Sequence, residues 1–578
     1  MRRRFLNARF AGRVAALTLG SAVLSVPATA EGPSTAVPAA ACAADPGGIT
    51  VPPGFCATIF ADNMGHVRHL AVAPDGVVYA NTWSGTYYGK DQPKTGGFVV
   101  AMRDSDGDGK ADVVRRFGET PESGGAGGTG IAFHDNAVFV EESDRILRYA
   151  IPQGMMAPDA APEIVVSGLP LDGDHPMHPF AIDGSGGLYV DLGSASNACQ
   201  SENRAAGARG ARPCVELETR GGIWRYESAK TGQTFSKAER FATGIRNAVG
   251  IAADATGVYA TQHGRDQLFE NWPKLYTQEQ GANQPAEVLL KLQRGADFGW
   301  PECYHDGEQG NLVLAPEYGG DGGKAVGPCA DKQPPVAAFP AHWAPNGLAF
   351  YHGAMFPHAY AGGAFIAFHG SWNRAPRPQG GYNVVFQPLS KGKATGPFVV
   401  FADGFAGAVK EPGQARYRPS GVAVGPDGAL YIGEDTRGRI WRVTFQGDRS
   451  AATLERAPEP APIAVEMTAA ADLPVPEGFT SDQIVLGRDV YLAQSCSGCH
   501  ASNGKGTPFG PDLTSGTWLW GDGSVAAISE AIRDGIPAPK EYKSVMPPLG
   551  GGALSEAELA AIAAYVWALG NDGAQQGR

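Results

Sequence analysis

The chain has 578 residues, too many for one hydrophobic core, and this length predicts two or more domains. Glycine accounts for 80 residues, about twice the usual share of roughly 7%, which favours a turn-dense β architecture over a helical one. The formal net charge of −12 argues against nucleic acids and anionic membranes as partners.

The first 30 residues have the pattern of a secretory signal peptide. Arginines at positions 2–4 precede a short apolar run at residues 14–26, and Ala28-Thr29-Ala30 is an A-x-A cleavage site. The arginines fit an ordinary basic n-region, and they also resemble a twin-arginine signal. The run is too short to span a bilayer comfortably, and no later segment is long and apolar enough. We therefore expect a periplasmic protein without a membrane span.

A motif of alternating apolar residues, a tight polar turn and a second β-rich run recurs six times. In the last copy, Pro426-Asp427-Gly428 supplies the turn between two alternating runs. The copies begin at His69, Gly130, Pro179, Gly250, Gly347 and Gly421. Six such units predict a six-bladed β-propeller over residues 31–445. The alternative is a β-sandwich whose hairpins are alike by chance.

An acidic loop, DSDGDGKAD, lies between the first and second repeats. Its aspartates have the odd spacing of a calcium loop, and they are Asp104, Asp106, Asp108 and Asp112. The twelfth position is Arg115, where an EF-hand needs Glu, and no flanking helices are evident. The loop is either a structural calcium site or a solvated acidic turn.

Six of the eight cysteines lie outside the C-terminal motif described below. An even number of cysteines in an exported chain indicates disulfides, and six allow 15 connectivities. The nearest-neighbour scheme joins Cys42–Cys56, Cys199–Cys214 and Cys303–Cys329. A metal site is a poor alternative because no second C-x-x-C or paired His accompanies them.

The C-terminal part begins with an Ala- and Pro-rich linker, residues 446–478, and continues with helical patterns over 479–578. Ser555 and Glu558 form a capping box before an amphipathic helix. The segment QSCSGCH contains Cys-x-x-Cys-His, the attachment motif of haem c. Cys496 and Cys499 would form the thioethers and His500 would bind the iron. The alternative is a thioredoxin-like dithiol.

The sixth iron ligand should lie downstream of the motif. Met546, in SVMPPLGGG, is the best candidate, because a thioether raises the reduction potential of a haem and suits an electron acceptor. Met467 is the rival, but it precedes the motif. The sequence therefore predicts a mainly β, six-bladed propeller followed by a small all-α cytochrome c domain.

Basic and amide residues stand at the ends of the predicted propeller strands. The segments are VRHL, GIRN, HGRD, RGADFGWPECYHD, HGSWNR and RYRPSG. Arginines gathered around one mouth indicate a polyanionic small ligand. Each arginine taken singly would instead be a surface or inter-blade ion-pair residue.

Several of these segments make the chain similar to a known family. GIRNAVGIA, HGRDQL, GADFGWPEC and RPSGVAVGPDG resemble the soluble quinoprotein sugar dehydrogenases. The likeness covers residues 51–443, and the branch that acts on L-sorbosone and carries a fused cytochrome c is the most similar. The resemblance implies a propeller that binds pyrroloquinoline quinone (PQQ) and calcium.

The resemblance also implies roles for individual residues. His175 is the catalytic base, with His178 as its rival, and its pKa is expected near neutrality by default. Arg246 and Asn247 lie near the quinone carbonyls. The backbone carbonyls of two further residues bind calcium, and four arginines hold the quinone carboxylates. These are Gly264 and Arg265 for calcium, and Arg68, Arg374, Arg416 and Arg418 for the carboxylates.

The implied activity is oxidation of an aldehyde sugar, most closely L-sorbosone, to 2-keto-L-gulonate, L-ascorbate or both. Hydride passes to PQQ, the electrons pass to haem c, and a downstream cytochrome or quinone pool accepts them. Two other readings remain open. The propeller is a binding module beside an electron-transfer cytochrome, or it is a calcium-dependent lactonase.

Overall fold

The computed structural model describes residues 42, 45–83, 94–118, 127–375, 377–450, 453–459, 469–507, 509–542 and 544–574. The predicted signal peptide and Met467 lie outside these residues. From Cys42 onward the chain forms one compact unit. Among the described residues, no helix is long and apolar enough to cross a membrane.

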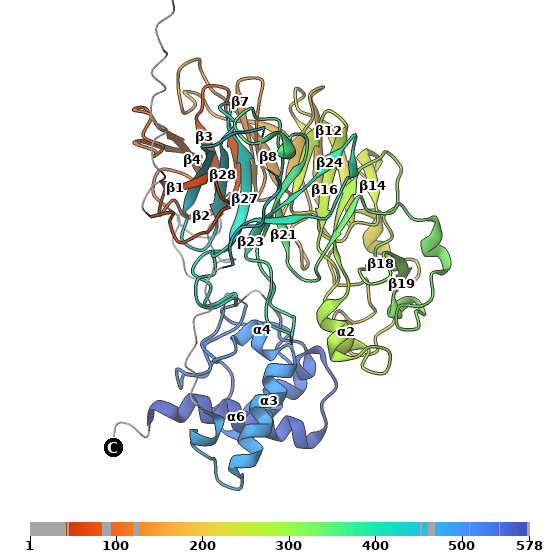
Figure 1. Cartoon of the computed structure of the whole chain (residues 1–578). Coiled ribbons are helices and arrows are strands. Elements are labelled where there is room, and N and C mark those ends of the chain that lie inside the picture. The colour runs from red at the N-terminus through yellow and green to blue at the C-terminus, as the bar shows by residue number, and fades with distance from the viewer. Residues whose placement is uncertain are drawn as a thin grey trace, which may run out of the picture. The chain divides into compact units, whose positions relative to one another are not determined.

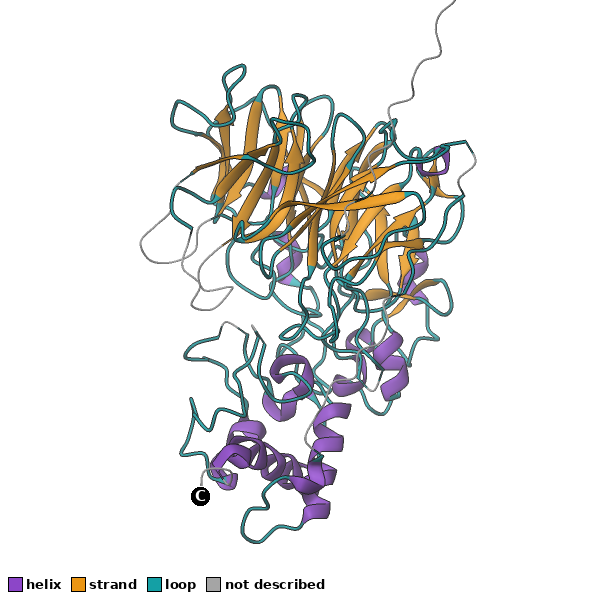
Figure 2. Cartoon of the chain, turned by 60° about the vertical axis from the view of Figure 1, so that its left-hand side comes forward, coloured by secondary structure: helices purple, strands orange, loops and turns teal. Residues whose placement is uncertain are grey.

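The β-rich part contains six blades, each built on four antiparallel strands (Figures 1 and 2), which confirms the predicted fold class. The second blade has a short fifth strand, β13 (Gln233–Thr234), in parallel pairing at its outer edge. The first three blades contain β2 (His66–Val72), β3 (Val78–Trp83), β4 (Val99–Arg103) and β5 (Val113–Phe117); β6 (Ile131–His134), β7 (Ala137–Glu142), β8 (Arg145–Ala150) and β9 (Glu163–Ser167); and β10 (Phe180–Ile182), β11 (Gly187–Leu192), β12 (Gly222–Glu227) and β14 (Arg240–Thr243). Five of the six predicted repeats lie on the first two strands of a blade, whereas the repeat at Gly347 covers the first strand of the fifth blade and ends before its second strand.

The last three blades follow the same order. They contain β15 (Ile251–Asp254), β16 (Gly257–Gln262), β17 (Glu287–Lys291) and β20 (Ala337–Phe339); β21 (Pro345–Phe350), β22 (Ala364–Phe368), β23 (Asn383–Gln387) and β26 (Val399–Ala402); and β27 (Pro419–Val424), β28 (Leu430–Glu434), β29 (Ile440–Phe445) and β1 (Phe55–Ala61). The outermost strand of the sixth blade is therefore the first strand of the chain.

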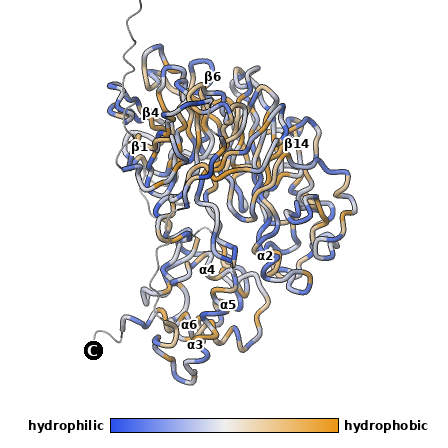
Figure 3. Tube along the Cα trace, viewed as in Figure 1, coloured by the Kyte–Doolittle hydropathy of each residue, from blue (hydrophilic) through white to orange (hydrophobic). Residues whose placement is uncertain are grey.

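The blades form a closed ring. The first strand of each blade contacts the first strand of the next, in the cyclic order β2, β6, β10, β15, β21, β27 and back to β2. Apolar residues fill the spaces between neighbouring sheets, and the hydrophobic colour in Figure 3 follows these strands. In the sixth blade, Phe55 on β1 packs its ring edge-on against Phe356 and Phe401.

Buried polar side chains on the second strands join each blade to the next. Glu141 accepts hydrogen bonds from the backbone N–H groups of Gly130 and His178. Asp191 accepts from Ala248 N at 3.2 Å. A buried backbone donor without a partner is costly, so these contacts stabilise the ring where the blades converge.

The connections between strands carry short additional elements. They are α1 (Leu268–Asn271), α2 (Gln278–Asn283), the β18 (Cys303–Asp306) and β19 (Asn311–Leu314) hairpin, β13 (Gln233–Thr234), and the β24 (Leu389–Ser390) and β25 (Lys393–Ala394) hairpin. Disulfides join Cys42–Cys56, Cys199–Cys214 and Cys303–Cys329. The nearest-neighbour scheme is therefore the one that the structure has.

The C-terminal part contains α3 (Ser481–Ala493), α4 (Cys496–His500), α5 (Val525–Asp534) and α6 (Glu556–Asn571). The predicted capping box is present, because Ser555 and Glu558 exchange side-chain and backbone hydrogen bonds. Helices α3 and α6 pack closely at Gly487, where a Cβ atom would lie 2.1 Å from Ala561 O. Glycine is needed there for the two backbones to approach.

Asp191 should make the stability of the propeller depend on pH. Burial raises its pKa to about 8, and its second carboxyl oxygen has no partner among the described residues. An unfolded chain ionises this group near pH 4, whereas the native state keeps it protonated. Between pH 4 and 8, stability therefore falls as pH rises, by about 1.4 kcal/mol per pH unit for this one group.

We expect Asp191→Asn to remove that contribution, so that the free energy of unfolding falls less steeply with pH over this range. Urea unfolding followed at several pH values measures the slope. Asp135→Asn, in an exposed turn with 87% of the side chain accessible, is the matched control and should leave the slope unchanged. An unaltered slope in Asp191→Asn would show that this carboxyl is ionised in the native state.

Candidate functional site

One cavity, of about 630 Å³, collects most of the residues singled out in the sequence. Its lining includes residues of the propeller and residues of the C-terminal helical domain. From the propeller come Arg68, His175, Arg246, Asn247, His263, Gly264, Asp266, His369 and Arg418; from the helical domain come Cys496, Cys499, His500 and Met546. The candidate base, the candidate anion ligands and the candidate haem ligands therefore face one space.

The propeller places its polar residues here because each stands at an end of a first or second strand. His175 precedes β10, Arg246 precedes β15, and His263 follows β16. The pairing of β2 with β3 shifts between Val67 and Leu70, so the strand carries a bulge at Arg68. Bulges redirect side chains next to functional sites. The closed ring then brings all these strand ends together.

His175 is held in one tautomer. Its Nδ1 lies 2.8 Å from Ser194 O, and because a carbonyl only accepts, Nδ1 carries the hydrogen and Nε2 carries the lone pair. Burial, followed by the positive charge of Arg246, lowers the pKa of His175 to about 3. The sequence led us to expect a value near neutrality, and that expectation ignored desolvation. The imidazole is therefore neutral at pH 7.

His178 has a different environment. Its Nδ1 lies 3.1 Å from Ser143 O and its Nε2 lies 2.9 Å from Pro170 O, so backbone carbonyls engage both ring nitrogens. The side chain is buried and is not among the described residues that line the cavity. The geometry favours His175 over His178 as the group that faces a ligand.

Arg246 is fixed by four hydrogen bonds. Its guanidinium donates to Asn197 O and Asn197 Oδ1, to Gly264 O at 3.0 Å, and to Asp266 Oδ2 at 2.8 Å. Burial would raise the pKa of Asp266, but Arg246 and then Arg204 outweigh it and hold that pKa well below its usual range. A rigid, buried cation therefore faces the cavity, with its partner carboxylate ionised.

A second charged group forms another part of the lining. Asp435 forms an ion pair with Arg68 and accepts a hydrogen bond of 2.7 Å from Nε2 of His369. Burial lowers the pKa of His369 to about 4, so its ring is neutral at pH 7. Arg418 donates from Nε to His369 O at 3.0 Å and from Nη2 to Gly370 O at 3.0 Å. Both guanidinium groups are buried. They are positioned to receive anionic groups of a ligand.

Three of the predicted arginines have other contacts. The side chain of Arg265 forms an ion pair with Glu317, which leaves the prediction about its backbone carbonyl untested. Arg374 donates to Ala341 O at 3.1 Å, and Arg416 is exposed and stacks over the Tyr417 ring. Neither Arg374 nor Arg416 belongs to the described lining of the cavity. Their carboxylate-binding roles are therefore not supported by where the side chains lie.

The structure adds residues to which the sequence gave no role. His263 lines the cavity, and its Nε2 is buried without a partner among the described residues. Asp266 and Asn373 form a hydrogen bond of 2.8 Å, and Trp372 and His369 also line the space. These residues belong to the segments HGRD and HGSWNR, which the sequence analysis selected without giving these five residues a role.

The donor set fits a polyanionic quinone. Buried guanidinium groups of Arg68, Arg246 and Arg418 surround a space that also contains the unpaired Nε2 of His263, and a ligand atom can satisfy that nitrogen. The Gly264 carbonyl, the predicted calcium ligand, accepts from Arg246 but has a second lone pair. The residues present are thus compatible with PQQ and calcium.

The helical domain offers a haem attachment site to the same cavity. Cys496 and Cys499 are not joined by a disulfide, and both lie on α4 with His500. His500 Nδ1 lies 3.0 Å from Pro511 O, which leaves Nε2 for a metal. Met546 is held by a two-way backbone bridge with Ile536. Both predicted iron ligands line the cavity.

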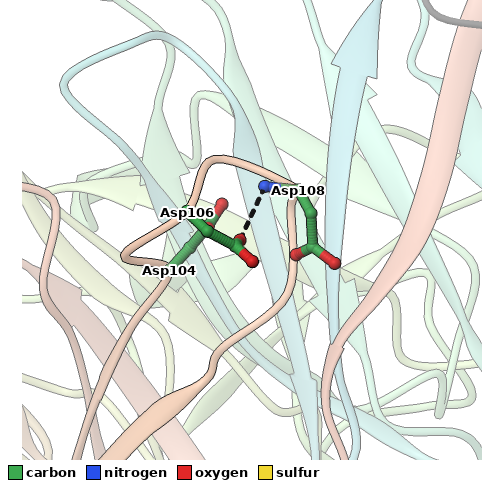
Figure 4. Close-up of side chains that lie close together, drawn as sticks. All are labelled: Asp104, Asp106 and Asp108. Atoms are coloured by element: carbon green, nitrogen blue, oxygen red, sulfur yellow. Dashed lines mark hydrogen bonds between the residues drawn. The ribbon is translucent and has the colours of Figure 1, made fainter.

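The acidic loop lies elsewhere, in the connection between β4 and β5 (Figure 4). Asp104, Asp106 and Asp108 offer carboxylate oxygens that all lie within 4.8 Å of one another. Asp112 instead accepts hydrogen bonds from Ser105. Two strands flank the loop, so it is not an EF-hand. Calcium binding at this loop stays a prediction.

The fold is a six-bladed propeller followed by a helical domain with a haem attachment motif. Arginines of the propeller and residues of the helical domain line the same cavity. Residues 49–446 match the TrAA12-like family, and the chain belongs to that family. Residues 484–570 match the cytochrome c family, which confirms the class of the second domain.

Two solved structures share the propeller fold. A family AA12 protein from Trichoderma reesei has a TM-score of 0.54 and 17% identity, over 69% of this chain and 98% of that one. The holo form of the pyranose dehydrogenase PQQ domain from Coprinopsis cinerea has a TM-score of 0.54 and 19% identity, over 68% of this chain and 97% of that one. At these identities the likeness shows the fold alone.

Curated relatives match shorter segments. An uncharacterised Borreliella burgdorferi protein is 28% identical over 36% of this chain and 50% of its own length. The PQQ-dependent pyranose dehydrogenase of Coprinopsis cinerea is 26% identical over 34% of this chain and 30% of its own length. The FixP subunit of a cbb3-type oxidase from Rhizobium etli is 38% identical over 13% of this chain and 27% of its own length. The chain thus spans half or less of these relatives.

Met546 is expected to be the axial methionine of a haem attached at Cys496 and Cys499. Met546→Ala should abolish the methionine–iron charge-transfer absorbance. It should also lower the haem potential by part of the roughly 0.8 V range that axial ligands span. Absorbance spectra and a redox titration of the purified protein test this, and Met467→Ala is the control. Retention of the absorbance band and the potential in Met546→Ala would point to another ligand.

Proposed function

We propose that the protein is a PQQ-dependent dehydrogenase that oxidises an aldehyde sugar and passes the electrons to its own haem c. The observation that carries the proposal is the shared cavity, because the candidate base and anion ligands line the same space as the haem motif. The family match and the PQQ-dependent relative in Coprinopsis cinerea support it. A haem beside the cavity would serve neither a lactonase nor a simple binding propeller.

The cofactors suit the residues that would hold them. Arg68 and Arg418 would bind carboxylates of the quinone, and Arg246 and Asn247 would lie at its carbonyls. When bound, PQQ accepts two electrons as hydride from the substrate carbon, and calcium acts on it as a Lewis acid. The Gly264 and Arg265 carbonyls would supply calcium ligands.

His175 would take the proton of the substrate hydroxyl. Its Nδ1 hydrogen is committed to Ser194 O, so Nε2 is the nitrogen that accepts. Because burial and Arg246 keep the imidazole neutral at pH 7, the base is available without a prior deprotonation. Arg246, fixed by Asn197 and Asp266, would stabilise negative charge that develops opposite it in the cavity.

This proton transfer determines the form in which an aldehyde sugar would react. An aldehyde has no hydroxyl at its oxidised carbon, so it would react as its hydrate, which yields an acid, or as a cyclic hemiacetal, which yields a lactone. Either route removes two electrons and two protons from the substrate. L-Sorbosone is the proposed sugar, with 2-keto-L-gulonate, L-ascorbate or both as product; the sequence resemblance supports this choice.

The haem would receive the two electrons one at a time and pass them to a cytochrome or quinone pool. An oxidising compartment suits the chain, because the three disulfides form and persist only outside the reducing cytosol. The predicted signal peptide supports a periplasmic location.

Removal of the cofactors tests the proposal. Treatment with a chelator should release PQQ, because both calcium and the arginines are needed to bind the quinone. It should therefore abolish the reduction of an artificial electron acceptor by L-sorbosone. Calcium plus PQQ should restore the rate, whereas either one alone should not. Undiminished oxidation by chelated, quinone-free protein would refute the assignment, and lactone hydrolysis without haem reduction would favour the lactonase.

The two histidines give a sharper test. His175→Ala should slow haem reduction by L-sorbosone roughly 10²- to 10⁴-fold, the range for loss of a general base. The variant should retain PQQ and haem, and dithionite should still reduce its haem fully. His178→Ala is the matched control because backbone carbonyls engage its ring. Stopped-flow haem absorbance gives the rates, and the reverse ranking would assign the base to His178.

A further inference from the structure

The propeller contacts both loops that present the predicted iron ligands. On the Met546 side, Gln267 Nε2 donates to Gly550 O at 3.3 Å and Asn271 Nδ2 donates to Gly551 O at 2.9 Å. Gln267 has a left-handed backbone, with φ +62°, at the start of α1. This backbone conformation costs free energy in a residue other than glycine. The hydrogen bonds of the Gln267 side chain to Arg204 and Gly550 offset that cost and fix its position.

The His500 side has its own contacts. Glu411 accepts a hydrogen bond from Ser502 N at 3.1 Å, and Asn503 Nδ2 donates to Gln414 Oε1 at 3.0 Å. The propeller loop that contains both acceptors also approaches through Gly413. A Cβ atom there would lie 2.2 Å from Gly506 O, so glycine is required for the two backbones to meet.

A third contact is made at Gly498, on α4 inside the haem attachment motif. A Cβ atom at Gly498 would lie 2.3 Å from Trp372 O and 2.6 Å from Trp372 Cε3. Trp372 belongs to the propeller and lines the cavity. The turn that carries Cys496 and Cys499 therefore packs directly against the propeller backbone, with no space for a side chain.

Neither haem attachment nor helix formation accounts for this glycine. Attachment requires the two cysteines and the histidine, and leaves the two residues between the cysteines free. Glycine is also one of the least favourable residues inside a helix. The close approach of Trp372 is the constraint that the structure supplies for Gly498.

A charged network links this contact to the catalytic side of the cavity. Arg204 forms ion pairs with Asp174, the neighbour of His175, and with Asp266, the partner of Arg246. Its Nη1 also donates to Gln267 Oε1 at 3.3 Å. Residues beside the candidate base and residues that contact the haem domain are thus fixed by one guanidinium group.

We propose that the haem domain docks on the propeller through the thioether edge of its haem, with Gly498 as the positioning residue that permits the contact. A haem attached at Cys496 and Cys499 would then present that edge to the propeller and would accept electrons there. The source of the electrons in this inference rests on the proposed function. The docking of the haem domain on the propeller does not depend on which substrate is oxidised. Glycines on both sides, Gly498 and Gly413, set how closely the domains approach.

The test replaces Gly498 by alanine. Alanine favours a helix more than glycine does, so the substitution should leave α4, haem attachment and the haem potential intact. A displaced domain should slow haem reduction by L-sorbosone on the order of 10- to 10²-fold, since misplacement by about 1 Å has effects of that size. Reduction of a small artificial acceptor, which collects electrons at the propeller, should stay at the wild-type rate.

Two further measurements keep the outcome interpretable. Hydrogen–deuterium exchange should be faster for the Ser502 amide, which donates to Glu411 across the contact, in Gly498→Ala than in the wild type, whether or not sugar is oxidised. Gly413→Ala, on the propeller side and outside the haem motif, should reproduce both effects, and it replaces Gly498→Ala if that variant loses its haem. Ser497→Ala, the other variable position of the motif, is the matched control and should match the wild type.

Wild-type rates of haem reduction together with unchanged exchange of the Ser502 amide in both glycine variants would overturn the docking proposal. Failure of the wild-type protein to reduce the artificial acceptor with any aldehyde sugar would instead count against the proposed function. In that case the exchange measurement would still decide whether the domains dock through Gly498.

Discussion

The pairing of β1 with β29 is the contact on which the rest of the molecule depends. It runs from Phe55↔Phe445 to Ala61↔Ile440 and supplies the outer strand of the sixth blade from the start of the chain. No covalent bond joins the two ends of the ring, so the hydrogen bonds of this strand pair close it. Only in a closed ring do six separate strand ends meet around one cavity, and every feature of the candidate site follows from that convergence.

The charges in the cavity are balanced by buried carboxylates. Asp435 pairs with Arg68 and accepts a hydrogen bond from His369, while Asp266 pairs with Arg246 and Arg204. A buried cation without a partner is strongly destabilising, and a paired one is tolerated when its remaining hydrogen bonds are satisfied. The two aspartates thus allow the protein to keep guanidinium groups at the cavity before any anionic ligand binds. The same charges and the same burial keep His175 neutral.

The haem attachment motif lines the same cavity as the propeller residues, so the two domains share one site. A haem on a separate cytochrome would have to meet the propeller by diffusion. Here the contacts at Gln267, Asn271 and Glu411 hold the loops on both sides of the motif. Backbone carbonyls and glycines dominate this contact, so its geometry depends on close approach more than on side-chain chemistry.

Much of the architecture was predictable from the sequence because it depends on local patterns. Alternation around turns such as Pro426-Asp427-Gly428 specifies hairpins, and Cys-x-x-Cys-His needs only neighbouring residues. The number of blades and the class of the second domain followed from these patterns. The haem ligand His500 was assigned for the same reason.

The tertiary structure alone decided the features that depend on distant segments. It selected one disulfide connectivity out of 15, turned His175 toward the cavity and engaged both nitrogens of His178, and placed Arg374 and Arg416 outside the described lining. It also showed that burial shifts the pKa of His175, which no local pattern records. Gly498 illustrates the limit most clearly. Its neighbours in sequence identify the haem motif, but the constraint on it comes from Trp372, more than a hundred residues away, and becomes visible only when the two backbones meet.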